Sequence, residues 1–131
     1  MLDQSELQDR LLSELGEAGE ENIPTLANTV FAGAENFDEQ RAGMRDALGS
    51  LMHAGLVRVA LEGQAGLDEL SKARSRNIIE QLEVHLVVRP DVLAWTGGPR
   101  PWPEIVTTAN GKVRAHAVLE SRGYQWWRKP G

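Results

Sequence analysis

The sequence predicts a single α+β domain that is mainly helical and extends over residues 1–131. Three amphipathic helical patterns in the first 54 residues lead directly into a short strand pattern. Two further strand patterns flank a loop rich in proline and glycine, and a capped helical pattern follows them. The length of 131 residues, with 41% hydrophobic and 25% charged residues, is typical of one globular domain.

The first three helices are marked by apolar residues at helical spacing and by start and stop signals. A helix is expected over about residues 4–15, where Asp3 can cap the first turn. A second helix follows Asn22, and a third runs from about 38 to 54 and ends at Gly55. The apolar stripes of these helices are formed by Leu7, Leu11, Leu12, Leu15, Ile23, Leu26, Ala27, Val30, Phe31, Met44, Ala47, Leu48 and Leu51.

The middle of the chain combines one clear strand with one ambiguous segment. Residues 56–61 alternate as in a half-buried strand. Residues 67–82 have the composition of a helix, whereas residues 82–88 also alternate partly like a strand, so both structures remain open there. We expect helix nearly to Val88, and Pro90 ends either structure.

The last third predicts a β-hairpin followed by a helix. Residues 92–96 and 104–107 are short strand candidates, and the loop Gly97–Pro103 between them is too rich in proline for a helix or a central strand. Thr108 can cap a helix that extends over about residues 111–122. Beyond it, the chain is expected to form a terminal strand or an extended tail.

Composition excludes several kinds of chemistry. The chain has no cysteine, which removes thiol catalysis, disulfides and thiolate zinc sites. Its three histidines, His53, His85 and His116, do not pair with a carboxylate or each other at metal-binding spacing, and no nucleophile or phosphate-loop motif is present. We therefore expect no metal, no cofactor and no enzymatic activity. With no signal peptide and no long apolar run, we expect a cytoplasmic protein without a membrane partner.

Charge is distributed unevenly along the chain. Residues 1–65 carry 12 acidic and 4 basic side chains, a balance of −8, whereas residues 66–131 carry 7 acidic and 10 basic ones, a balance of +3. A polyanion would be repelled by the first half and weakly attracted by the second.

Two segments resemble winged helix-turn-helix proteins. The run Ala47–Arg58, which reads ALGSLMHAGLVR, resembles the end of a recognition helix that leads into the first wing strand. The run Pro103–Gly111 is similar to the last wing strand and the entry to a C-terminal helix. The resemblance, closest to MarR-like and PadR-like regulators, implies a helix-turn-helix core with a first strand over 1–61. A central helix, a wing hairpin, a C-terminal helix and a tryptophan-rich tail would follow over 66–131.

The family resemblance implies a dimeric transcriptional regulator that binds double-stranded DNA. Its recognition helix would lie near 38–54 and its wing loop near 97–103. Glutamine and arginine suit base edges in the major groove, other polar side chains suit phosphates, and a wing arginine suits phosphate or the minor groove. The residues implied for DNA binding are Gln40, Arg41 and Arg45 for the bases, Thr25 and Asn28 for phosphates, and Arg100 for the wing.

The residues also allow a different function on the same fold. The segment 38–54 contains Asp38, Glu39 and Asp46 beside its two arginines, so its own balance is −1, whereas helices that bind DNA are usually basic. Its polar residues could simply be solvated. The alternative is a protein-interaction module, or an inhibitor, whose acidic N-terminal face docks a basic protein partner.

The apolar residues of the second half predict an interface. Trp126 and Trp127 are adjacent, so in an extended segment they would face opposite sides and one would be exposed. Exposed tryptophan is typical of interface hot spots. Ile78 and Leu82 add apolar surface to the central helix, which its own sheet or a second copy could cover. We expect these four residues to form the interface of a homodimer.

Overall fold

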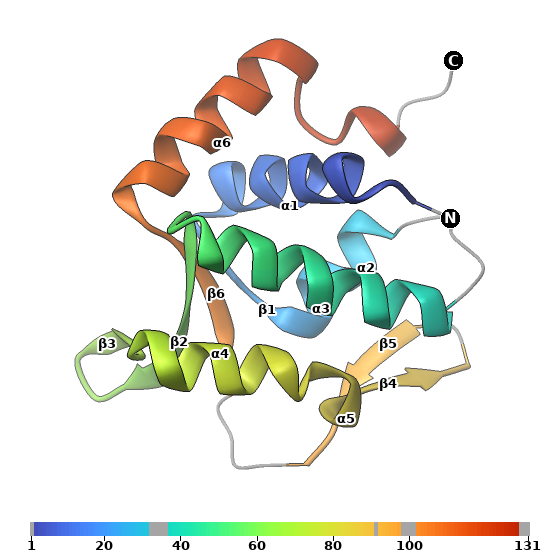
Figure 1. The fold of residues 1–131 in the computed structure, drawn as a ribbon, viewed down its shortest axis with the longest axis vertical. Coiled ribbons are helices and arrows are strands. Elements are labelled where there is room, and N and C mark those ends of the chain that lie inside the picture. The colour runs from blue at the N-terminus through green and yellow to red at the C-terminus, as the bar shows by residue number, and fades with distance from the viewer. Residues whose placement is uncertain (1, 32–36, 91, 98–101, 129–131) are drawn as a thin grey trace.

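In the computed structural model, residues 2–31, 37–90, 92–97 and 102–128 are described. They form six α-helices, two antiparallel sheets and one short 3-10 helix (Figure 1). The α+β class is as the sequence predicts. In Figure 1, α1 and α6 lie on one side of α3, and α4 lies on the other side. No helix in the described ranges is both long and apolar enough to cross a bilayer.

The first helix, α1 (Gln4–Ala18), buries one leucine face in the core. Asp3 caps it as expected, since its carboxylate accepts a hydrogen bond from the Ser5 N–H. The leucine face is fully buried, with exposed fractions of 2% or less. Gly19 ends the helix with a φ of 85°, which a residue with a side chain rarely adopts.

A short strand and the two following helices complete the first half. The strand β1 (Glu20–Asn22) was not predicted, because three polar residues carry no strand pattern. The helix α2 (Ile23–Val30) starts at Asn22, whose side chain accepts from the Thr25 N–H. The helix α3 (Phe37–His53) begins and ends within one residue of the prediction. Their apolar stripes join α1 in one core.

The larger sheet has the strand order β1-β6-β2-β3, with every neighbouring pair antiparallel. The strand β2 (Val57–Gly63) is the strand expected after the third helix. It turns back at once into β3 (Gly66–Glu69), where helix was expected, and the β2–β3 hairpin projects from one side of the molecule (Figure 1). The strand β6 (Glu104–Thr107) lies between β1 and β2.

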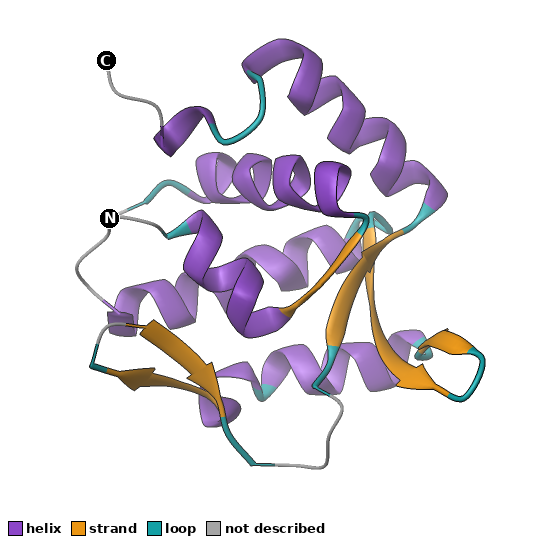
Figure 2. Cartoon of the chain, turned by 180° about the vertical axis from the view of Figure 1, so that it is seen from behind, coloured by secondary structure: helices purple, strands orange, loops and turns teal. Residues whose placement is uncertain are grey.

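The predicted hairpin of residues 92–96 with 104–107 is therefore wrong. The strand β5 (Val92–Trp95) pairs with β4 (Leu86–Arg89) instead, and these two strands form the second sheet (Figure 2). Arg89 pairs with Val92, so Pro90 lies in a tight reversal that connects neighbouring strands. Short strands do not specify their partner strands by themselves. The reversal at Pro90 brings β4 next to β5 over a much shorter connection than the loop Gly97–Pro103, which separates β5 from β6.

The predicted central helix is also divided. Ser71 caps α4 (Lys72–Glu80), and α5 (Leu82–His85) follows after Gln81. The open question for residues 82–88 resolves into both structures, since a helical turn up to His85 is followed by β4.

The C-terminal helix, α6 (Ala109–Arg122), has the expected cap. The Thr108 hydroxyl accepts a hydrogen bond from the Gly111 N–H, and Gly123 follows the last turn. The expected terminal strand or extended tail is wrong, because Trp126–Arg128 form a 3-10 helix. This short helix packs beside α1. Residues 123–128, which we call the C-terminal arm, therefore return to the N-terminal half of the chain (Figure 1).

Candidate functional site

The β4–β5 hairpin covers the part of α2 and α3 that was expected to face DNA. Asn28 on α2 donates from its side-chain amide to the Leu93 carbonyl at 2.8 Å and accepts from the Leu93 N–H at 2.9 Å. Both Leu93 groups point away from β4, so Asn28 satisfies the outer edge of β5. The residue expected to bind a phosphate is thus engaged in a contact within the chain.

Arg41 on α3 holds the opposite edge of the same hairpin, and Arg45 holds the preceding helix α5. Arg41 donates from Nε to the Leu86 carbonyl at 2.5 Å and from Nη2 to the Glu83 carbonyl. It also pairs with Asp38 at 3.3 Å. Arg45 pairs with the Glu83 carboxylate and with Asp46. These guanidinium groups, expected to contact bases, are committed to α5, β4 and neighbouring acids.

Of the remaining three residues expected to bind DNA, only Gln40 is placed differently from the expectation. Gln40 is only 6% exposed, and neither its amide nitrogen nor its carbonyl oxygen has a hydrogen-bond partner among the described residues. Thr25 is exposed, and its carbonyl accepts from the Thr29 hydroxyl. Arg100 lies outside the described residues. The acidic residues Asp38, Glu39 and Asp46 are exposed on α3, whereas the side chains of Arg41 and Arg45 are 20% and 39% exposed.

Apolar burial fixes the hairpin and its preceding helices on α2 and α3. Ile79, Leu82, Leu86 and Leu93 are all at most 3% exposed and belong to the common core. Fully burying such a side chain stabilises a fold by about 1.5–3 kcal/mol. Uncovering the α3 arginines would expose all four, and it would also break the polar contacts to Asn28 and Arg41. The contacts on α3 are therefore a structural part of the domain.

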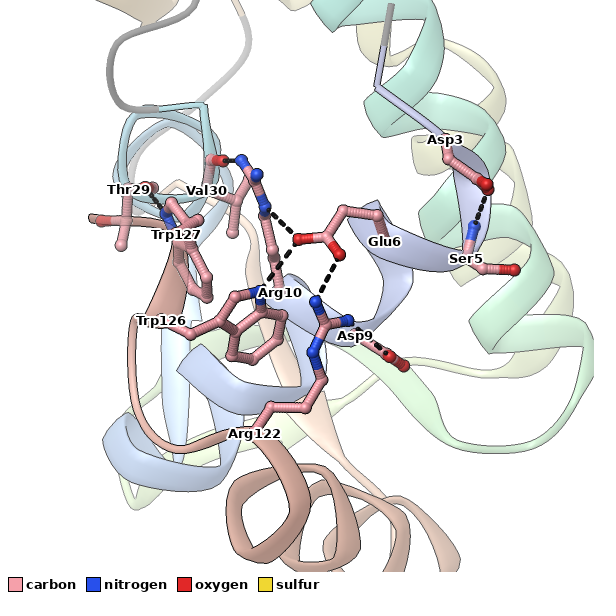
Figure 3. Close-up of polar contacts among 10 residues, drawn as sticks. All are labelled: Asp3, Ser5, Glu6, Asp9, Arg10, Thr29, Val30, Arg122, Trp126 and Trp127. Atoms are coloured by element: carbon pink, nitrogen blue, oxygen red, sulfur yellow. Dashed lines mark hydrogen bonds and ion pairs between the residues drawn. The ribbon is translucent and has the colours of Figure 1, made fainter. Parts of the chain in front are cut away.

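The side chains expected at a dimer interface make most of their contacts with other residues of the same chain. Leu82 is fully buried and Ile78 is half-buried against the core. Trp126 donates from its indole nitrogen to Glu6 at 3.0 Å, and Trp127 donates to the Thr29 carbonyl at 3.2 Å (Figure 3). Leu82 therefore has no surface to offer a second copy, and the two indole N–H groups are satisfied internally.

Glu6 is the centre of the contacts that fasten the C-terminal arm (Figure 3). It accepts from Arg10, Arg122 and Trp126, and Arg122 also bonds Asp9 at 3.1 Å and stacks over the Trp126 ring. Burial alone would raise the pKa of Glu6, but these hydrogen bonds outweigh it and hold the pKa below its usual value. The cluster is a docking contact between α1 and the arm.

The larger sheet exposes an acidic face. On its side opposite the buried Val57, Val59 and Ile105, alternate positions of the four strands place four carboxylates, and Arg58, the one basic residue of these strands, lies on the same side. We call this set the acidic sheet face, which consists of Glu20, Glu62, Glu69 and Glu104.

None of these four carboxylates forms an ion pair with a cation in the described ranges. Burial raises the pKa of Glu104, and the negative charges of Glu20 and Glu62 raise it further. These four carboxylates were not predicted as a site, because the acidic binding surface was expected on the N-terminal helices. The alternation of Glu104 with the buried Pro103 and Ile105 is the signal that could have found it.

Two carboxylates, those of Glu14 and Glu21, lie close to Tyr124 at the start of the C-terminal arm. Glu14 is 4% exposed and accepts from the Tyr124 hydroxyl at 2.7 Å, a contact that, after burial, helps raise the pKa of Tyr124 to about 12. Glu21 on β1 has a buried Oε2 atom with no hydrogen-bond partner in the part of the chain that the structure describes. Burial, and then the charge of Glu14, raises the pKa of Glu21 to about 7.

Replacing Glu21 with glutamine is expected to stabilise the protein at alkaline pH. Because the folded pKa of about 7 lies above the ordinary glutamate pKa of 4.5, the native chain loses stability as pH rises from 4.5 through 7. After a discount for the partial exposure of the carboxylate, Glu21→Gln should add about 1–2 kcal/mol at pH 8. Urea unfolding at pH 5 and pH 8 measures the effect, with Glu80→Gln on α4 as the exposed control. An equal gain from Glu21→Gln at both pH values would contradict the assignment.

In the described ranges, no three histidine, cysteine or acidic side chains group closely enough to hold a metal ion. Among the residues expected to bind DNA, Asn28, Arg41 and Arg45 serve instead in edge contacts and ion pairs within the chain. The arrangement can therefore bind through charge and through backbone hydrogen bonds, and the acidic sheet face brings four carboxylates together beside one arginine, Arg58. No family model, no curated protein sequence and no solved structure matches this chain.

Proposed function

We propose that this chain is a protein-interaction module that binds a basic segment of a partner protein through the acidic sheet face. The observation that carries the proposal is the set of four carboxylates on one side of one sheet, without an ion pair to a described cation. The sequence left open a protein-interaction function that uses an acidic N-terminal face. We keep this function and place the acidic binding surface on the larger sheet instead.

Like charges at this density favour a cationic partner. Glu104 is half-buried between Glu20 and Glu62, and their repulsion makes its ionised form costly. A lysine or arginine placed against these carboxylates would relieve the repulsion, and the field of the face would accelerate the encounter at low salt. Both effects predict an affinity that decreases as salt increases.

A fluorescence anisotropy titration with a labelled lysine- and arginine-rich peptide tests the proposal. We expect binding at low salt that weakens at physiological salt, and a loss of about tenfold or more in Glu62→Gln/Glu104→Gln, because each rim charge contributes up to about 1 kcal/mol. The matched control is Glu17→Gln/Glu80→Gln, which removes the same charge from exposed positions on α1 and α4. An equal loss of affinity in both double variants would mean that only the net charge of the protein attracts the peptide. That result would contradict binding at the acidic sheet face.

A winged helix-turn-helix DNA-binding regulator is the second candidate. The element order α1-β1-α2-α3-β2, with β6 placed between β1 and β2, supports a winged-helix arrangement with an insertion between β2 and β6. Three exposed cations on α4, Lys72, Arg74 and Arg76, have no ion pair in the described ranges and favour contact with a polyanion.

The same anisotropy assay with labelled duplex DNA separates the two functions. Under the regulator hypothesis, DNA binds with a steep salt dependence, and replacing the three α4 cations with glutamine weakens it. Under the interaction hypothesis, the basic peptide binds and DNA does not, because the acidic sheet face repels phosphate.

A further inference from the structure

The strand β3 leaves one backbone edge open. It is the last strand in the order β1-β6-β2-β3, and its ladder pairs Gly63 with Gly66 and Leu61 with Asp68. Leu70 continues that ladder, since its N–H donates to the Val59 carbonyl. In an antiparallel pair the bonded positions alternate, so the N–H and C=O groups of Leu67 and Glu69 point away from β2.

The outward groups of β3 differ from those of the second sheet. No described side chain or backbone group bonds the outward N–H or C=O of Leu67 or Glu69. In the β4–β5 hairpin, by contrast, Asn28 and Arg41 satisfy outward groups of Leu93 and Leu86. The β2–β3 hairpin projects from one side of the molecule in both views (Figures 1 and 2), and Gly66, Asp68 and Glu69 of β3 are exposed.

Charge determines which strand this edge can accept. The hairpin contains Glu62, Asp68 and Glu69 and no lysine or arginine from Leu61 to Ser71. Glu62 and Glu69 lie on the acidic sheet face, whereas Asp68 lies on the opposite face. A second copy that paired here would bring its own carboxylates against these, which is unfavourable across strands. A basic strand would meet opposite charge on both faces.

We propose that the open edge of β3 binds an extended lysine- and arginine-rich segment of a partner protein, which adds as a strand beside β3. The outward groups of Leu67 and Glu69 supply main-chain hydrogen bonds, and alternate basic side chains reach Glu69 on one face and Asp68 on the other. The inference rests on the proposed function, because it specifies how the basic partner of the acidic sheet face is held.

Two pairs of probes separate strand addition from charge attraction. The first pair is Glu69→Gln and Glu69→Pro, which remove the same charge, while only proline also removes the outward N–H and leaves the β2–β3 ladder bonds in place. The second pair is a peptide of alternating lysine and threonine and the same peptide methylated at alternate backbone nitrogens. The methylated peptide keeps every charge but cannot donate along one edge, and it leaves the protein unchanged.

We expect the parent peptide to bind, and the amide resonances of Leu67 and Glu69 to shift most in a titration of ¹⁵N-labelled protein. Glu69→Pro should bind about tenfold more weakly than Glu69→Gln, and the methylated peptide should lose at least as much. If both peptides and both variants bind equally well, strand addition is overturned while the proposed function stands. If no basic peptide binds even at low salt, both are overturned.

Discussion

Replacing Gly111 with alanine is expected to destabilise the domain by about 3 kcal/mol or more, which is among the largest effects of a single methyl group. An added Cβ would lie 1.9 Å from the Leu56 carbonyl oxygen and 2.9 Å from its carbon, and both are backbone atoms that cannot rotate away. The same carbonyl accepts the Thr108 N–H at 3.0 Å, and the Thr108 hydroxyl donates to Gly55 at 2.6 Å. Relief of the clash would therefore displace the start of α6 from the end of α3.

Gly49→Ala is the matched control for this variant. Gly49 lies inside α3, and an added Cβ there meets no atom within 4 Å. Alanine in a helix interior is more favourable than glycine by about 0.5–1 kcal/mol, so this variant should be slightly stabilised. Urea unfolding followed by far-UV circular dichroism measures both changes. A neutral Gly111→Ala would mean that α6 does not approach Leu56 as closely as described.

The helices could be predicted because their signals are local. Asp3, Asn22 and Thr108 each cap a helix through a backbone group only two or three residues away, which the sequence displays directly. Strand pairing is decided by residues far apart in sequence. β6 lies between β1 and β2, and the four residues Glu104–Thr107 contain no pattern that identifies either of these two strands as a partner. The mispredicted hairpin and the missed β1 follow from that difference.

The side-chain contacts of the candidate site could likewise be predicted only in part. Arginine and asparagine suit base edges and phosphates because they present several donors, and the same donors suit exposed backbone carbonyls. Residue type therefore predicted that Asn28 and Arg41 make polar contacts, but not with which acceptor. The acceptors, Leu93 and Leu86, come from a hairpin that packs on these helices only in the tertiary fold. Gln40 was misplaced for a related reason, since its neighbours in sequence are charged while its side chain is buried.

Replacing Arg41 with alanine is expected to destabilise the domain by about 2–3 kcal/mol, because a hydrogen bond from a charged donor contributes about 1.5–3 kcal/mol. The guanidinium is half-buried and donates to the carbonyls of both Leu86 and Glu83, and alanine leaves both without that donor. Loss of the contact should also raise amide hydrogen exchange in β4 above that in α1, because the hairpin edge is released first. Urea unfolding and hydrogen exchange measure the two effects.

Arg76→Ala is the control for charge, since Arg76 is exposed on α4 and forms no ion pair with a described residue, and its removal should change stability by less than about 0.5 kcal/mol. Arg41→Lys keeps the charge but loses the planar pair of donors, so it should recover only part of the lost stability. If Arg41→Ala instead unfolds like the native chain and loses only DNA binding, the arginine contacts DNA, as the family resemblance implies. A stability loss without any change in binding would establish it as the side chain that fastens β4 to α3.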